Sequence, residues 1–129
     1  MTRALVSCDL PEPPSVERAR QLLDLGADLV KVESHAAELA AAGIPVWAQI
    51  ENADDAKAME DAGAVLIDFR HSAPEAGAAA CAAVAIPVLG GLGGGPWLDG
   101  RVRAIHRLLD EPLASYADDV RSGRPVKGD

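Results

Sequence analysis

Lys31 and Glu33 are the residues of this chain whose types and spacing first indicate chemistry. They lie in the stretch GADLVKVES, residues 26–34, where an apolar run carries the two charges two positions apart. In a strand both side chains would therefore point to the same face. The preceding glycine ends a predicted helix and the following residues resume a helical pattern, so the charges lie where a strand becomes a loop. Parallel α/β folds carry their chemistry at such strand ends, so the stretch predicts a functional site.

Further polar residues follow the other predicted strands and would share one rim of the sheet. They are Ser7 and Asp9; Ser34 and His35; Gln49, Glu51 and Asn52; Asp68, Arg70 and His71; and the glycines of residues 90–95. Asp9 and Glu33, on adjacent strands, are a reasonable pair of ligands for Mg²⁺, which binds one or two carboxylates and keeps waters for a chelating substrate. An equally good interpretation pairs Glu33 with Lys31 or Arg70 as ordinary rim charges.

The histidines and cysteines give weaker signals. His35 and His71 could serve in acid–base chemistry because an imidazole titrates near neutral pH, although for His35 a solvated position at a helix start is favoured. His106 has the helical spacing of a packing or surface residue. Cys8 falls in an apolar strand and Cys81 in an alanine-rich helix, which predicts buried free thiols. No paired Cys/His spacing supports a zinc site.

The glycine-rich segment 90–95 could form a backbone cradle for a carboxylate or phosphate. It has neither the ending of a nucleotide-binding loop nor the spacing of a dinucleotide fingerprint. The alternative is a tight turn packed against the sheet. Trp47 and Trp97 are predicted to be packing residues, although Trp97 lies close enough to the segment to wall a ligand.

The elements that must position these residues alternate between strand and helix. The predicted strands are residues 3–8, 29–33, 46–50, 65–69 and 87–89; the predicted helices are residues 15–25, 36–42, 54–62, 74–84 and 98–109, with a short one at 113–120. Joints that end a helix and open a strand recur about every twenty residues. This repetition predicts a parallel sheet with right-handed crossovers, either part of a (β/α) barrel or a small doubly wound sheet.

The length and composition of the chain limit the number of domains and the kinds of binding partner. The chain has 129 residues, 49% hydrophobic and 25% charged, which predicts a single domain spanning residues 1–129. A net charge of -8 argues against binding to nucleic acid or to anionic membrane surfaces. No apolar run approaches the ~20 residues of a membrane span, and a cytoplasmic protein is expected.

Several motifs occur together in a characteristic order. They are RALVSCDLP, GADLVKVE, AAAGIPV, EDAGAVLI, and IPVLGGLGGG followed by LDGRVRAIHRLLD. In this order the chain resembles the ketopantoate hydroxymethyltransferase family, a metal-dependent branch of the phosphoenolpyruvate mutase and isocitrate lyase barrel superfamily. The resemblance starts at the family's third strand. It therefore implies a partial (β/α)₈ barrel lacking the first two strands, or an open α/β sheet of five parallel strands.

The resemblance also implies an activity. The family binds a small 2-oxo acid through Mg²⁺ and transfers a hydroxymethyl group from methylenetetrahydrofolate to the enolised carbon. By resemblance Asp9 would be a direct metal ligand, Glu33 would hold a metal-bound water, and Lys31 would bind the substrate carboxylate or oxo group. A related aldol or lyase step on a 2-oxo acid is expected rather than the authentic ketopantoate reaction.

Departures from the family pattern place that activity in question. One metal-binding aspartate of the family has no counterpart here, and its catalytic glutamate falls on Arg70, which cannot act as a base. Proton abstraction would need a substitute such as Asp68, His71 or Glu51. The candidate catalytic residues are Lys31, Asp68, Arg70 and His71, and the candidate substrate-binding residues are Ser7, Lys31, Gln49, Gly90, Gly91 and Gly93.

Two further expectations concern partners and alternatives. A five-stranded sheet leaves two open edges, and the apolar edge at residues 3–8 predicts cover by another copy, a partner chain or the C-terminal segment, hence a homo-oligomer. The alternative function is a catalytically inactive relative that serves as a binding or assembly module. A response-regulator-like receiver fits the five strands and Asp9 but lacks a lysine at the end of the fifth strand.

Overall fold

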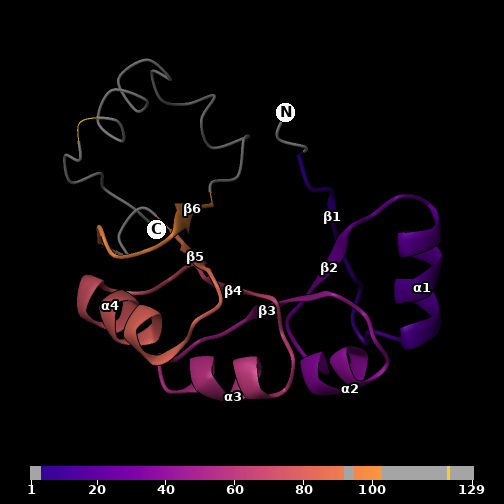
Figure 1. Ribbon diagram of the computed structural model, residues 1–129, viewed down its shortest axis with the longest axis horizontal. Helices are drawn as coiled ribbons and strands as arrows, with labels where there is room; N and C mark the ends of the chain where they lie inside the picture. The colour runs from indigo at the N-terminus through magenta and orange to yellow at the C-terminus, as the bar shows by residue number, and fades with distance from the viewer. Residues whose placement is uncertain (1–3, 92–94, 103–121, 123–129) are drawn as a thin grey trace.

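The computed structural model describes residues 4–91, 95–102 and 122 of the chain. Strands and helices alternate along them (Figure 1). The strands are β1 (Ser7–Asp9), β2 (Leu29–Val32), β3 (Val46–Gln49), β4 (Leu66–Phe69), β5 (Val88–Gly90) and β6 (Gly100–Arg101); the helices are α1 (Val16–Asp24), α2 (Ala36–Ala41), α3 (Asp55–Asp61) and α4 (Pro74–Ala83). The predicted α/β fold is therefore confirmed.

All the strands lie in one parallel sheet in the order β1-β2-β3-β4-β5-β6. Figure 1 shows α1 to α4 in an arc along one side of this sheet. A doubly wound sheet reverses its strand order and carries helices on both faces, whereas a barrel keeps its strands in chain order with all helices outside. The arrangement is that of a barrel segment, which was one of the two predicted architectures.

Helix ends follow the local chemistry that the sequence predicts. Ser15 caps α1, and its Oγ accepts a hydrogen bond from the backbone N–H of Arg18 at 3.1 Å. Gly26, Gly43 and Gly63 follow α1, α2 and α3 with φ angles of 112°, 81° and 103°, a region that side chains with a Cβ rarely adopt. These joints turn each helix back into the next strand and produce the repeat of about twenty residues.

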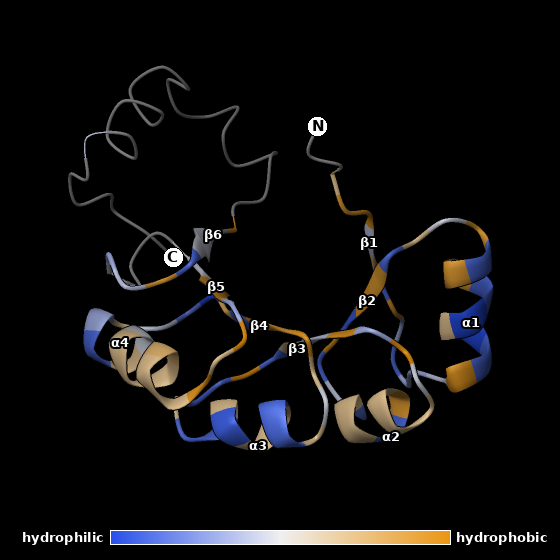
Figure 2. Cartoon of the chain, viewed as in Figure 1, coloured by the Kyte–Doolittle hydropathy of each residue, from blue (hydrophilic) through white to orange (hydrophobic). Residues whose placement is uncertain are grey.

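The core lies between the sheet and the helices. Val30, Val46, Ile67 and Val88 on the helix-facing side of the strands are fully buried. Helix residues that meet them are small, and Ala19, Ala56 and Ala80 are fully buried as well. Figure 2 shows hydrophilic residues prominent on α1 and α3 and hydrophobic residues on β2. Alanine contacts let the helices approach the sheet closely, as the low aromatic content predicts.

The first strand differs from its prediction. A buried strand at residues 3–8 was expected, but β1 is Ser7–Asp9, and Leu5 and Val6 are 70% and 52% exposed. Residue 3 lies outside the described residues. Val6 is held by Asp28, whose carboxylate accepts from the Val6 N–H at 2.9 Å and whose N–H donates to the Val6 carbonyl at 2.7 Å. The apolar run remains exposed because, among the described elements, only β2 pairs with β1.

The predicted helix at residues 98–109 is wrong at its start, because Gly100–Arg101 forms β6. Asp99 ties this segment to β5: its N–H donates to the Val88 carbonyl at 3.0 Å, and its carboxylate accepts from the Val88 N–H at 2.8 Å. These bonds compete with a helical start. Residues 103–109 and the predicted helix at 113–120 lie outside the described residues. No helix in the described part of the chain is long and apolar enough to cross a membrane.

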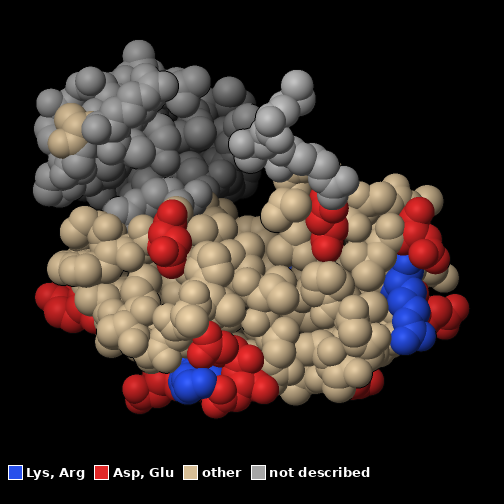
Figure 3. Space-filling model, in the orientation of Figure 1, with Lys and Arg blue, Asp and Glu red and all other residues tan. Residues whose placement is uncertain are grey.

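Glu60 links α3 to the loop before β5. Its Oε1 accepts hydrogen bonds from the N–H groups of Ala85 and Ile86 at 2.7 and 3.2 Å, and its Oε2 lies 3.2 Å from Lys57 Nζ. In Figure 3 a basic residue lies among acidic ones over α3. The hydrogen bond from Ala85 and then the bond from Lys57 hold the pKa of Glu60 below its ordinary value of 4.5.

This lowered pKa predicts a pH dependence. A carboxyl whose pKa is lower in the folded state stabilises the fold above its unfolded pKa, and this contribution is lost as the pH falls through the folded pKa. We expect Glu60→Gln to lower the melting temperature by a few degrees at neutral pH, and the difference to shrink below about pH 4. Calorimetric melts across pH measure it. Glu17→Gln, on the exposed face of α1, is the control. A difference that is unchanged at low pH would contradict the assignment.

Candidate functional site

The residues at the carboxyl ends of β2, β3 and β4 alternate between two faces of the sheet. The register places Asp9 beside Lys31 and Gln49 beside Asp68. Their neighbours Val32 and Ile67 belong to the buried core under the helices. Lys31, Gln49 and Asp68 therefore share the face turned away from the helices, which in a barrel segment is the inner face.

Asp68 is the centre of a hydrogen-bonded network on this inner face. Its side chain is fully buried, and its Oδ2 accepts from Arg70 at 2.5 Å (Nη2) and 3.2 Å (Nε). Lys31 Nζ lies 3.3 Å from the same oxygen and donates to Gln49 Oε1 at 2.9 Å. Gln49 Nε2 in turn donates to Glu51 Oε1 at 3.3 Å. We call Lys31, Asp68 and Arg70 the cationic network, because two cations share one carboxylate.

The two cations of the network compensate the buried negative charge of Asp68. An unpaired carboxylate in the interior would be strongly destabilising, so Asp68 is retained only because two cations surround it. The hydrogen bonds to Asp68 raise the pKa of Arg70 above its ordinary value, and the charges of Asp9 and Glu33 act in the same direction. Arg70 is therefore a permanent cation, and the network carries one net positive charge.

Asp9 and Glu33 lie together beside this network, and we call them the acidic pair. With Leu10, Glu12 and Lys31 they line a pocket of about 200 Å³. Neither carboxylate makes a side-chain hydrogen bond or salt bridge within the described residues. The interpretation that paired Glu33 with Lys31 or Arg70 is wrong there, because both cations contact Asp68 instead.

The acidic pair has the chemistry of a partial divalent-cation site. Two exposed carboxylates that have no side-chain partner among the described residues suit an ion such as Mg²⁺, which retains several of its waters. The described residues contain no cluster of three or more His, Cys, Asp or Glu side chains that would form a fuller cage. The donor set therefore fits a hydrated Mg²⁺ and does not fit a closed structural metal site.

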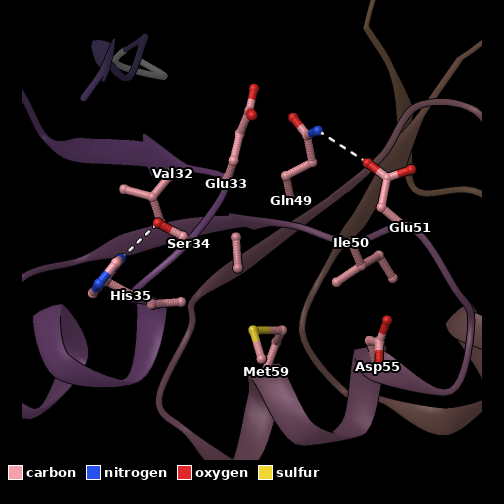
Figure 4. A pocket seen from close by; sticks show the side chains of 11 residues that line it. Val32, Glu33, Ser34, His35, Gln49, Ile50, Glu51, Asp55 and Met59 are labelled. Carbon is pink, nitrogen blue, oxygen red and sulfur yellow. Dashed lines mark hydrogen bonds between the residues drawn. The ribbon is translucent and has the colours of Figure 1, made fainter. Parts of the chain in front are cut away.

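A second pocket of about 250 Å³ lies between the ends of β2 and β3 and the starts of α2 and α3 (Figure 4). Glu33 and Gln49 line it, as do Met59 and Asp55 from α3. Figure 4 shows Glu33 and Gln49 on the side of this pocket away from Met59 and Asp55. Both side chains therefore lie at the boundary between this pocket and the rim of the sheet.

His35 belongs to this second pocket and is the N-cap of α2, where it is exposed. Its Nδ1 lies 2.6 Å from Ser34 Oγ, which donates to Glu12 Oε2 at 2.7 Å. The preferred interpretation of His35 as a solvated helix-start residue is confirmed. His71 is also exposed, on the loop after β4.

The remaining predicted site residues are distributed along the rim. Ser7 is exposed in the edge strand β1, and Gly91 is buried directly after β5. Gly90 is buried within β5, where an added Cβ would lie 3.1 Å from the Phe69 carbonyl and would collide with Leu98, so packing explains this glycine. Gly93 and His106 lie outside the described residues. Cys8 and Cys81 are free and half-buried, and burial raises the pKa of the Cys81 thiol.

The sequence did not reveal that Asp68 holds two cations. The available signal was an aspartate in the middle of an apolar strand with an arginine two positions later on the same face, a spacing that places their side chains together.

Trp47 was expected to be a packing residue and is half-buried beside Lys31 in the register. Its Nε1 is nevertheless a buried donor that finds no acceptor in the described part of the chain.

The chain is similar in sequence to known proteins. No protein-family model matches the chain. It is 30% identical over 143 residues to the 3-methyl-2-oxobutanoate hydroxymethyltransferase of Psychrobacter cryohalolentis, an alignment that covers 83% of this chain and 53% of that protein. The resemblance to ketopantoate hydroxymethyltransferases is confirmed as a distant one.

Two other hydroxymethyltransferases of the same name give similar values. The chain is 30% identical over 180 residues to the protein of Methylobacterium sp. strain 4-46 and 27% identical over 179 residues to that of Hyperthermus butylicus. Each alignment covers 95% of this chain and 62% of the relative. The chain thus spans between about half and three-fifths of the length of these hydroxymethyltransferases.

Proposed function

We propose that this chain binds a small 2-oxo acid together with Mg²⁺ at the inner rim of the sheet and promotes enolate-type C–C bond chemistry. The observation that carries the proposal is the meeting of the acidic pair and Lys31 in one pocket. A 2-oxo acid carries a carboxylate and a polarisable carbonyl. The carboxylate requires a positively charged side chain, and the carbonyl requires a metal ion held by carboxylate ligands. The names of the curated relatives agree, since they describe transfer of a hydroxymethyl group to a 2-oxo acid.

Each residue has a distinct part in this proposal. Asp9 and Glu33 would hold a Mg²⁺ ion, which when bound polarises the oxo group and stabilises negative charge on the enolate oxygen. Lys31 is held by Asp68 and Gln49, which use two of its three N–H donors, so one N–H remains for the ligand. Its charge offsets that of the substrate carboxylate.

Proton abstraction from the carbon beside the oxo group needs a base that is not already neutralised. Asp68 is fully buried between two cations, which makes it a positioning residue for Lys31 and Arg70. Glu51 is exposed and joined to the network through Gln49, and we propose it as the proton acceptor. Methylenetetrahydrofolate as the donor of a one-carbon group rests on the resemblance alone.

A binding or assembly module without catalysis is the second candidate. The specific observation that favours it is Arg70, a permanent cation bonded to Asp68 at the strand end where the family resemblance expects a catalytic base. The exposed residues Leu5 and Val6 beside the β1 edge offer a surface for a second copy of the chain. Sedimentation velocity measures that self-association.

Calorimetric titration tests the first candidate. We expect 3-methyl-2-oxobutanoate to bind only when Mg²⁺ is present, and Asp9→Ala to weaken this binding by about tenfold or more because one of two metal ligands is lost. Asp24→Ala, an exposed carboxylate at the end of α1, is the matched control and should bind as the wild type does. Exchange of the substrate C3 proton in D₂O, followed by NMR, then separates catalysis from binding. Absence of Mg²⁺-dependent binding would remove the enzyme proposal.

A further inference from the structure

Arg70 stands in a fixed position on the inner rim. Three contacts to Asp68 involve its Nε and Nη2 atoms, at 3.3, 3.2 and 2.5 Å, and Asp68 itself is fully buried. A guanidinium bound on one edge by a rigid carboxylate loses little further freedom when a ligand binds to its other edge. Arg70 is thus preorganised for an anion.

The outer edge of Arg70 is available. The Arg70 side chain is 34% exposed, and its Nη1 atom makes no hydrogen bond with any described residue. A guanidinium has five N–H donors, and both N–H groups of Nη1 remain to bind an acceptor. Among the described residues, this edge of Arg70 is therefore free to bind a ligand.

Charge decides which acceptor fits. The cationic network has two cations and one carboxylate, so it attracts one additional negative charge. Arg70 also lies within electrostatic reach of Asp9 and Glu33, which would repel a phosphate dianion more strongly than a carboxylate. A single carboxylate is the matching ligand group.

We infer that Arg70 is a specificity-determining residue that binds a terminal carboxylate, and that the ligand is a small 2-oxo dicarboxylate. This inference rests on the proposed function, in which the acidic pair and Lys31 receive the oxo-acid end. The second carboxylate then reaches Arg70 from the same inner face. A pocket of about 200 Å³ at the acidic pair restricts the ligand to a short chain.

The test compares two 2-oxo acids by calorimetry in the presence of Mg²⁺. 2-Oxoglutarate carries the terminal carboxylate and 3-methyl-2-oxobutanoate does not. A charge-assisted hydrogen-bonded pair corresponds to a preference of about tenfold to a hundredfold. We expect the wild-type chain to bind 2-oxoglutarate more tightly by this factor, and glutarate, which lacks the oxo group, to bind more weakly than 2-oxoglutarate.

Variants of Arg70 show whether this residue causes the preference for 2-oxoglutarate. Arg70→Gln should remove the preference, measured as the ratio of the affinities for 2-oxoglutarate and 3-methyl-2-oxobutanoate, and Arg70→Lys should retain part of it, since lysine keeps the charge without the planar fork. Arg18→Gln, an exposed arginine of α1, is the matched control. Circular dichroism melts verify that each variant is folded, and the wild-type comparison is informative without any variant.

The outcomes separate the two proposals. Binding of both 2-oxo acids with Mg²⁺ but without a preference, or a preference that survives in Arg70→Gln, would overturn the dicarboxylate inference and leave the proposed function intact. Failure of both acids to bind with Mg²⁺ would overturn the proposed function together with this inference.

Discussion

Replacing Asp68 with alanine is expected to destabilise the fold by about 3 kcal/mol or more, because the change leaves two cations facing each other without their shared carboxylate. Lys31 has a side chain that is only 9% exposed, so water offsets little of this repulsion. Urea unfolding measures the free energy. Binding of any 2-oxo acid should be lost as well, since Lys31 would lose the carboxylate that positions it.

Two comparisons make the Asp68 result specific. Asp61→Ala removes an exposed carboxylate that pairs with Lys57 on α3, and exposed pairs of this kind contribute less than about 1 kcal/mol. The double variant Asp68→Ala with Lys31→Met removes the repulsion and should recover part of the lost stability. A single variant as stable as the wild type would show that the network does not hold the inner face together.

Lys31→Met is expected to separate ligand binding from stability. Asp68 would still be bonded to Arg70, and the methionine side chain fills a similar volume, so the free energy of unfolding should fall by less than in Asp68→Ala. The affinity for 3-methyl-2-oxobutanoate with Mg²⁺ should fall by about tenfold or more, because the substrate carboxylate loses its cation.

Calorimetry and urea unfolding on the same preparations measure both quantities for Lys31→Met. Lys57→Met, whose lysine is 55% exposed on α3, is the control and should leave the affinity unchanged. If Lys31→Met bound the 2-oxo acid as tightly as the wild type, Lys31 would be a structural partner of Asp68 alone, and the binding module without enolate chemistry would become the better proposal.

Local signals in the sequence predicted most of the fold. The Ser15 cap and the glycines that end α1, α2 and α3 are properties of short stretches, and the structure has them where the sequence places them. The proximity of Asp9 and Glu33 also followed from sequence, because adjacent parallel strands bring their carboxyl ends to one rim.

What sequence could not supply depends on contacts across strands. Lys31 and Asp68 lie on β2 and β4, with β3 between them, and only the side-chain geometry decides that Lys31 reaches past Gln49 to Asp68. Exposure of Leu5 and Val6 depends on which elements cover β1, which an apolar pattern does not encode. The two-residue strand β6 follows Asp99, which makes two hydrogen bonds to β5, and the helical pattern of the sequence did not predict these bonds.

The strict chain order of the strands has a kinetic consequence. Each strand pairs with the strand that comes next in the sequence, and each pairing from β1 to β5 closes a loop of one helix and its joints. Short loops have small closure entropies, and sheets built from local pairings fold faster than those that join distant segments. We therefore expect folding to begin at the central strands β2 to β4 and to spread outward, with β1 and β6 the first to exchange their amide hydrogens.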